Sequence, residues 1–222
     1  MVVNIGEPFC YINHTDGGFA AGAGTPMTYL AASAAREGLV GLEFAAGIPG
    51  SLGGAVIMNA GAFGGFIGEK IGSVKLVSGS GDLLNLKRAD LIFGYRTSNL
   101  VGRGVIVEVK LELKKGDPEE SLKRIEHLMV ERRDRHPNLP SAGSVFRNLP
   151  DQPAGRIIES AGGKGLRIGK AEVSTQHANF IVNTGGASAA DILVLINAVR
   201  QLVRDKYNID LEPEVKIVGE ER

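Results

Sequence analysis

The stretch GIPGSLGGAVIMNAGAFGG, residues 47–65, is the longest of four glycine-rich stretches in this chain. Glycine has no Cβ, so successive backbone N–H groups can turn inward and bind the oxygens of a phosphate. Ser51 adds a hydroxyl donor and Asn59 an amide. The stretch has neither the spacing of a dinucleotide-binding loop nor the lysine of a P-loop. Composition alone therefore leaves two interpretations open: a backbone cradle for an anion, or a tightly turned core element packed through glycine and alanine.

The composition is that of a globular protein whose charges cancel. The 222 residues include 25 Lys and Arg against 25 Asp and Glu, and 43% are hydrophobic. Such a chain has no overall field to attract nucleic acid, and no apolar run approaches the roughly 18–20 residues that span a membrane. Its start has no signal-peptide pattern, so we expect a cytoplasmic protein. We expect Cys10, the one cysteine, to be buried in its apolar run, and the histidines, which lack metal-ligand spacing, to hold no metal.

Hydrophobic periodicity predicts mixed strands and helices up to residue 137. One or two strands cover residues 2–23 with a turn at 15–18, and a helix with Thr25 as its N-cap stops at Gly38. A hairpin (73–77 and 83–86) precedes a regularly alternating strand at 104–113. Asp117 is then the N-cap of a helix that runs to about residue 135. The apolar stripe predicted for this helix consists of Leu122, Ile125, Leu128 and Met129.

The remaining third of the chain has its own pattern. We predict helices at 154–161 and 188–207, the second with Ser188 and Asp191 as a capping box, and strands at 171–173 and 180–183. A final strand at 209–218 should place Glu214 and Lys216 on one face. The fold class is α+β. We expect one domain over residues 1–138, to which 209–222 return, and a second over 139–208.

Three further motifs carry groups that chemistry can use. Tyr95 and Arg96 lie between two predicted strands, where a guanidinium can bind a carboxylate or phosphate; a surface ion pair is the simpler interpretation. Ser144 lies in the loop 141–148 without the partners of a hydrolase triad, so a turn serine is the simpler interpretation there. Glu214 and Lys216 are equally typical of exposed charged alternation.

Together, and in this order, the motifs resemble the UDP-N-acetylenolpyruvoylglucosamine reductase family, over nearly the whole chain. The matching segments are 41–55, 58–64, 94–96, 142–146, 163–169, 177–183 and 211–215. The short segment between Arg96 and Ser144 resembles the family's shorter type. The resemblance implies part of an FAD-binding domain of the vanillyl-alcohol-oxidase kind, followed by a substrate-binding domain of this family.

The resemblance also implies an activity in peptidoglycan synthesis. Members take a hydride from NADPH through FAD and reduce UDP-N-acetylglucosamine enolpyruvate to UDP-N-acetylmuramate. By motif position the catalytic residues are Ser144 as the acid, with Arg96 and Glu214 beside the substrate carboxylate. The FAD contacts implied are Gly47, Ile48, Pro49, Gly50, Ser51, Gly53, Gly54, Asn59 and Gly61. The substrate contacts implied are Tyr95, Asn148, Lys164, His177 and Lys216.

The chain departs from the family pattern at three places. Arg147 stands where lysine is usual and Lys216 where arginine is common, so the geometry of bidentate contacts changes. Relatives begin with a further lobe that contributes to FAD binding, which we do not find, so we expect a chain that starts inside the second lobe. A non-catalytic remnant that binds UDP-sugar but not FAD is therefore an alternative, as is another FAD oxidoreductase of the same fold. We expect a monomer that binds a small-molecule substrate.

Overall fold

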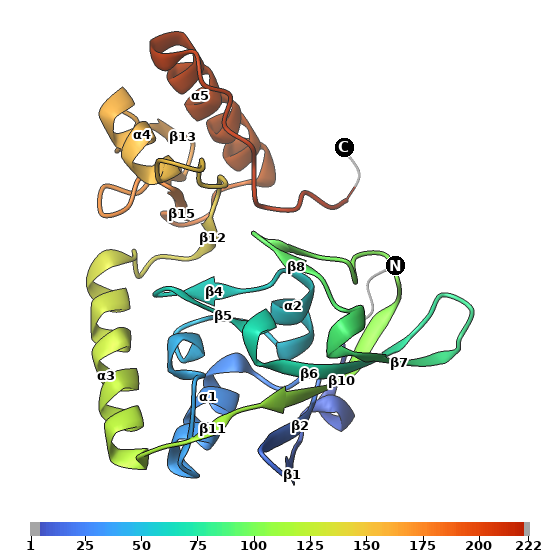
Figure 1. The fold of residues 1–222 in the computed structure, drawn as a ribbon. Helices are drawn as coiled ribbons and strands as arrows, with labels where there is room; N and C mark the ends of the chain where they lie inside the picture. Colours follow the sequence, from blue (N-terminus) through green and yellow to red (C-terminus); the bar gives the residue numbers. More distant parts are fainter. Residues whose placement is uncertain (1–4, 220–222) are drawn as a thin grey trace. The chain divides into compact units, whose positions relative to one another are not determined.

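The computed structural model describes residues 5–219 and shows two compact units, Met1–Arg132 and Arg133–Arg222. The division between the two units falls in the last turn of the long helix α3 (Pro118–Arg135), a few residues before the boundary expected from the sequence at 138–139. Each unit has its own hydrophobic core. The mixture of helices and strands confirms the α+β class (Figure 1).

The first unit is built on a five-stranded antiparallel sheet in the order β1-β2-β10-β6-β7. The strands of this sheet are β1 (Ile12–Thr15), β2 (Gly18–Gly22), β6 (Ile71–Val77), β7 (Leu83–Lys87) and β10 (Val105–Glu112). The short strands of the unit are β3 (Leu39–Val40), β4 (Gly61–Ala62), β5 (Gly65–Phe66), β8 (Phe93–Gly94), β9 (Thr97–Ser98) and β11 (Lys114–Lys115). Its helices are α1 (Met27–Arg36), α2 (Leu52–Ile57) and α3. The predicted hairpin and the predicted strand at 104–113 are confirmed as β6–β7 and β10.

Strand β10 places Ile106, Val109 and Leu111 in the core, where α2 packs against the sheet. Ile106 and Val109 are three residues apart rather than two, because the pairing of β10 with β6 is irregular between Ile106 and Glu108. A bulge changes which face a side chain occupies. The helix α2, formed by the middle of the glycine-rich stretch, is thereby fixed to the central strands (Figure 1).

Two predictions about the helices of this unit were wrong in part. The N-cap of α1 is Pro26, and the Thr25 hydroxyl instead donates to the Tyr11 carbonyl at 3.1 Å. In α3, Leu122 and Met129 are exposed and the buried residues are Ser121 and Leu128. Ser121, Ile125 and Leu128 lie on one side of the helix and form its packed stripe, which is narrower than the apolar pattern suggested. The Asp117 cap is confirmed, since its Oδ1 accepts from the Glu119 N–H at 2.7 Å.

Cys10 is exposed, which contradicts the prediction that it is buried. The apolar run around it forms a short 3-10 turn (Glu7–Phe9) and leads into β1, which pairs with a single strand at the edge of the sheet. An edge position leaves side chains without a neighbour on one side. The thiol donates to the Gly24 carbonyl at 3.1 Å.

The second unit has a four-stranded antiparallel sheet in the order β12-β15-β14-β13. The elements of this unit are β12 (Ser141–Ser144), α4 (Ala154–Ala161), β13 (Arg167–Ile168), β14 (Ala171–Val173), β15 (Phe180–Asn183) and α5 (Ala189–Tyr207). The predicted capping box of α5 is present, with Ser188 and Asp191 each accepting the other's backbone N–H. The core lies where α4 and α5 pack on each other and α5 packs on β13 and β14.

The final strand predicted at 209–218 was wrong within the described residues. The segment makes one isolated bridge, between Phe146 and Pro213, and Leu211 packs in the core of the second unit. Proline has no backbone N–H to continue a ladder, so pairing stops there. Glu214 and Lys216 therefore do not share the face of a strand.

Candidate functional site

Most backbone donors of the glycine-rich stretch are used inside the first unit. The N–H groups of Leu52 and Gly53 donate to the carbonyls of Thr25 and Ala23, each at 2.8 Å, and tie the stretch to the segment after β2. Among the described residues, no hydrogen bond is recorded for the N–H groups of Gly50 and Ser51. These two adjacent donors, at the start of α2, remain available for an anion.

The glycines of the stretch divide into packed and open positions. A Cβ on Gly53 would lie 3.0 Å from the Ala23 Cβ, and one on Gly61 would lie 2.3 Å from the Phe66 ring. A Cβ on Gly50, which has a φ of +108°, would have nothing within 4 Å. A Cβ on Gly54 would meet only the Ser51 hydroxyl, at 3.6 Å. Both interpretations of the sequence therefore apply, because the stretch is a packing element at some glycines and open backbone at others.

The side chain of Asn59 is hydrogen-bonded within the protein. It is buried and has a left-handed φ of 43°. Its Oδ1 accepts from the Gly68 N–H and its Nδ2 donates to the Gly94 carbonyl, both at 3.0 Å. The Ser98 hydroxyl donates to the Ile57 carbonyl at 2.9 Å nearby. The glycine-rich stretch thus holds the hairpin β8–β9 at both of its strands.

Tyr95 and Arg96 form the tip of that hairpin. Gly94 pairs with Thr97, and the turn requires a left-handed φ of 54° at Arg96. The Arg96 guanidinium carbon lies 5.2 Å from the centre of the Tyr95 ring, a cation–π contact. The turn therefore presents an oriented cation, which suits recognition of a carboxylate or a phosphate.

The second unit brings the segments of Ser144 and Glu214 together. The Glu214 N–H donates to the Val145 carbonyl at 2.7 Å, and the Arg147 N–H donates to the Glu212 carbonyl at 2.9 Å. Arg147 also forms an ion pair with Glu212 at 3.0 Å. Glu214, far along the sequence, is thereby hydrogen-bonded to the residue that follows Ser144. Arg96 belongs to the first unit.

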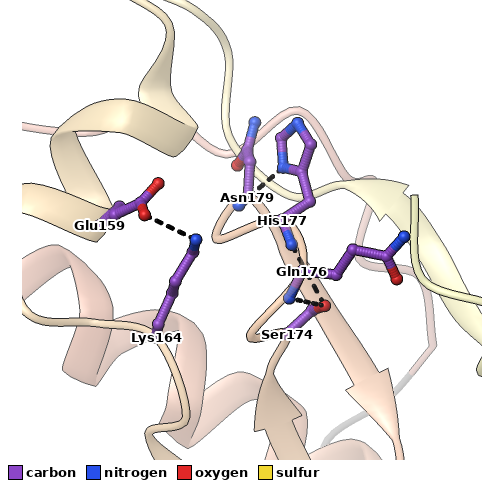
Figure 2. Close-up of polar contacts among 6 residues, drawn as sticks. All are labelled: Glu159, Lys164, Ser174, Gln176, His177 and Asn179. Atoms are coloured by element: carbon purple, nitrogen blue, oxygen red, sulfur yellow. Dashed lines mark hydrogen bonds and ion pairs between the residues drawn. The ribbon is translucent and has the colours of Figure 1, made fainter. Parts of the chain in front are cut away.

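Lys164 and His177 lie on loops of the second unit (Figure 2). Lys164 Nζ is directed at Glu159, with an ion-pair distance of 2.6 Å. The ring of His177 packs against His136 and Phe180, and burial lowers the pKa of His177 below its usual value. Neutral imidazole can accept or donate a hydrogen bond but carries no charge to pair with a diphosphate.

Asn148 and Lys216 lie elsewhere in the second unit. Asn148 Oδ1 accepts from the Ala154 N–H at 3.0 Å, at the start of α4. Lys216 is exposed and borders a hollow of about 530 Å³ together with Val145 and Ile217. Val145, which follows Ser144 in the chain, is thus one of the residues that line this hollow.

Sequence reasoning missed two residues that contact the predicted site segments. Arg132 lies over Gly47, where a Cβ would be 2.6 Å from Arg132 Cδ. Asn179 is 3% exposed and bonds to both backbone groups of Phe146. Both contacts join segments far apart in the chain; a polar residue inside the apolar run 178–182 was the only local signal for Asn179.

Among the described residues, no helix is both long and apolar enough to cross a membrane. No group of His, Cys, Asp or Glu within residues 5–219 could hold a metal ion.

Comparisons with known proteins match both units. Residues 3–87 match the family "FAD binding domain", and residues 135–218 match "UDP-N-acetylenolpyruvoylglucosamine reductase, C-terminal domain". The UDP-N-acetylenolpyruvoylglucosamine reductase of Halalkalibacterium halodurans is 48% identical over 90% of this chain and 67% of its own length. That of Clostridium tetani is 42% identical over 96% of this chain and 71% of its own length. A third, from Lachnoclostridium phytofermentans, is 45% identical over 90% of this chain but only 65% of its own length.

A solved structure agrees with these relatives. The crystal structure of UDP-N-acetylenolpyruvylglucosamine reductase from Thermus caldophilus superposes with a TM-score of 0.80 at 40% identity, over 91% of this chain and 73% of that one. This chain thus spans about two thirds to three quarters of the length of the relatives it matches. From the identity, the coverage and the shared fold, the chain belongs to the UDP-N-acetylenolpyruvoylglucosamine reductase family.

Proposed function

We propose that this chain carries out the NADPH-dependent, FAD-mediated reduction of UDP-N-acetylglucosamine enolpyruvate to UDP-N-acetylmuramate. The observation that supports it most is the hydrogen bond from the Glu214 N–H to the Val145 carbonyl, which sets Glu214 beside the Ser144 segment. Ser144 and Glu214 are the residues of the second unit to which the resemblance assigns the chemistry.

The residues of the first unit fit the anionic part of FAD. The unbonded N–H groups of Gly50 and Ser51, and the open backbone at Gly54, can receive a phosphate, and no side chain fills the space at Gly50. Bound FAD would supply hydride transfer from NADPH to the enolpyruvyl double bond. Gly53, Gly61 and Asn59 would support the cradle by packing and hydrogen bonding.

The protein's own residues supply recognition and the proton. Reduction adds a hydride to one carbon of the double bond, and a proton must reach the other, which bears the carboxylate. Ser144 would give that proton: its O–H bond breaks as the new C–H bond forms. A serine is a weak acid, so the enolic charge beside it must be stabilised. Arg96 can pair with the substrate carboxylate, and a protonated or hydrogen-bonded Glu214 can donate to it.

The remaining contacts follow the same assignment. Tyr95, Asn148, Lys164, His177 and Lys216 would bind the UDP-sugar, with Lys164, which pairs with Glu159 in the free protein, as a cation for the diphosphate. We further propose a monomer that works in the cytoplasm. The balanced charge supports a protein without a nucleic-acid or membrane partner, since it gives the chain no overall attraction to either.

Two measurements test the proposal. The purified chain, supplied with FAD, should retain a flavin absorption band; a colourless protein that FAD cannot restore would contradict the enzyme and leave a UDP-sugar-binding module. Ser144→Ala should leave flavin reduction by NADPH intact and block substrate reduction, while Ser141→Ala, at an exposed serine of the same strand, should leave both half-reactions intact. Loss of both half-reactions in Ser144→Ala would refute the role given to this serine.

A further inference from the structure

Asn179 makes four hydrogen bonds, three of them to the two residues that follow Ser144. Its side-chain Oδ1 accepts from the Phe146 N–H at 2.9 Å and its Nδ2 donates to the Phe146 carbonyl at 2.8 Å. Its backbone carbonyl accepts from the Val145 N–H at 2.8 Å. Its backbone N–H donates to His177 Nδ1 at 3.2 Å (Figure 2). The side-chain amide of Asn179 thus forms with Phe146 the pair of backbone hydrogen bonds that a neighbouring strand would otherwise form.

The opposite side of this segment is held by Glu214. Val145 receives the Glu214 N–H on its carbonyl, at 2.7 Å. All four backbone polar groups of Val145 and Phe146 are therefore bonded, three of them to Asn179. Both residues are nearly fully buried, at 3% and 1% exposed, so an unmet backbone group there would be costly.

The rest of β12 constrains Ser144 less firmly. Ser144 is the last residue of that strand and pairs with Phe180, but the pairing of β12 with β15 is irregular between Ser141 and Ser144, and Gly143 has a left-handed φ of +82°. A bulged strand bends and leaves an unpaired residue. The position of Ser144 therefore depends on its pair with Phe180 and on the residues after it, where Asn179 is the main partner.

We propose that Asn179 is the positioning residue that aims Ser144 at its substrate carbon. The inference rests on the proposed function, because it concerns the proton that Ser144 gives. Proton transfer depends on the donor lying within hydrogen-bond reach and in line with its acceptor. An amide is the side chain that offers one acceptor and one donor at the spacing of a peptide group, which is what Phe146 requires.

Two substitutions separate positioning from folding. Asn179→Ala removes both side-chain bonds. Asn179→Asp keeps the shape and the acceptor but, when ionised, sets an oxygen against the Phe146 carbonyl; once protonated, it can donate as the amide does. Burial raises the pKa of a carboxyl group, so protonation should occur at moderately acidic pH. Asn183→Ala is the matched control, because Asn183 Oδ1 accepts two backbone N–H groups at the far end of β15.

The experiment measures the two half-reactions of the FAD-loaded protein. Flavin reduction by NADPH should stay within about twofold in all three variants. Reoxidation by the enolpyruvyl substrate should slow by about 10- to 100-fold in both Asn179 variants, the size expected for a displacement of about 1 Å. As the pH falls, the rate of Asn179→Asp relative to wild type should recover, and that of Asn179→Ala should not. Comparison with wild type at each pH cancels the titration of His177, His136, Lys164 and Glu159 nearby.

Hydrogen exchange provides a readout that needs no turnover. The Phe146 amide should exchange faster in Asn179→Ala and stay protected in Asn179→Asp, which keeps the acceptor. Unchanged protection in Asn179→Ala, or wild-type reoxidation in both variants, would overturn the inference while leaving the proposed function intact. Equal slowing of both half-reactions would also overturn it, because that indicates general damage. A wild-type protein that carries FAD but reduces no substrate would refute the proposed function itself, and the inference with it.

Discussion

Asn59 Nδ2 donates to the Gly94 carbonyl at 3.0 Å, joining the glycine-rich stretch to the turn that carries Arg96. The same amide accepts from the Gly68 N–H, so one buried side chain connects three segments of the first unit. Its backbone has a φ of 43°, a left-handed conformation that asparagine tolerates better than most residues. The residue that the sequence suggested as a cofactor donor therefore also orders the turn of the candidate arginine.

Replacing Asn59 should destabilise the first unit in two separable ways. Asn59→Gly removes two buried hydrogen bonds and should lower the free energy of unfolding by about 1–3 kcal/mol. Asn59→Ala removes the same bonds and adds the strain of a left-handed alanine, about 1 kcal/mol more. Urea unfolding of both variants measures the difference. A stability equal to wild type in Asn59→Ala would show that these bonds contribute nothing.

The two asparagines also show where sequence reasoning ended. Helix caps were predicted correctly at Asp117 and Ser188 because a cap involves residues three apart in the chain. Asn59 and Asn179 bond to residues far along the chain, so their roles depend on the tertiary fold. The terminal strand failed for a similar reason: its alternation was real, but Pro213 and a single bridge to Phe146 decided its structure. The order of the motifs indicated the family, which local pattern could not do.

Gly54 and Gly53 allow the cofactor cradle to be tested apart from the packing. Gly54→Ala places a methyl group on α2 in ordinary contact with the Ser51 hydroxyl alone, at 3.6 Å, and should raise helix stability by about 0.5–1 kcal/mol. If FAD lies over this backbone, the same methyl group should weaken FAD binding, as measured by flavin fluorescence titration.

Gly53→Ala is the matched control, since its Cβ meets the Ala23 side chain at 3.0 Å. That variant should lose thermal stability through overpacking, by about 1–3 kcal/mol. Undiminished FAD affinity in Gly54→Ala would remove this position from the cradle.

Glu108 should make the first unit sensitive to acid. It accepts from the Tyr11 hydroxyl at 2.7 Å and pairs with Lys75 at 2.7 Å, and the hydrogen bond from Lys75 lowers the pKa of Glu108 against the opposing effect of burial. A carboxyl group whose pKa is lower in the folded state stabilises the fold above its unfolded pKa, and this stabilisation is lost as the pH falls through the folded pKa.

Unfolding measured from neutral pH to about pH 3 tests this linkage. Glu108→Gln should be less stable than wild type at neutral pH and should lose less stability on acidification. Glu126→Gln, at an exposed position of α3, should follow the wild-type curve. Parallel curves for Glu108→Gln and wild type would contradict the linkage. Burial and, to a smaller extent, the same carboxylate raise the pKa of Tyr11 to about 12. The contribution of Tyr11 to the stability of the fold should therefore disappear at strongly alkaline pH.

His177 should report whether a diphosphate binds beside it. In the free protein, burial lowers the pKa of His177, so the ring is neutral at pH 7. A nearby diphosphate would favour the charged ring and raise that pKa. By reciprocity of linkage, UDP should then bind more tightly as the pH falls below the ordinary histidine value of about 6.5. NMR titration with and without UDP measures the shift directly, and exposed His127 on α3 is the internal control. An identical His177 pKa in both titrations would place the diphosphate elsewhere. Lys164 would then be the residue to examine, because its positive charge acts on His177 and contributes to lowering the pKa of that ring.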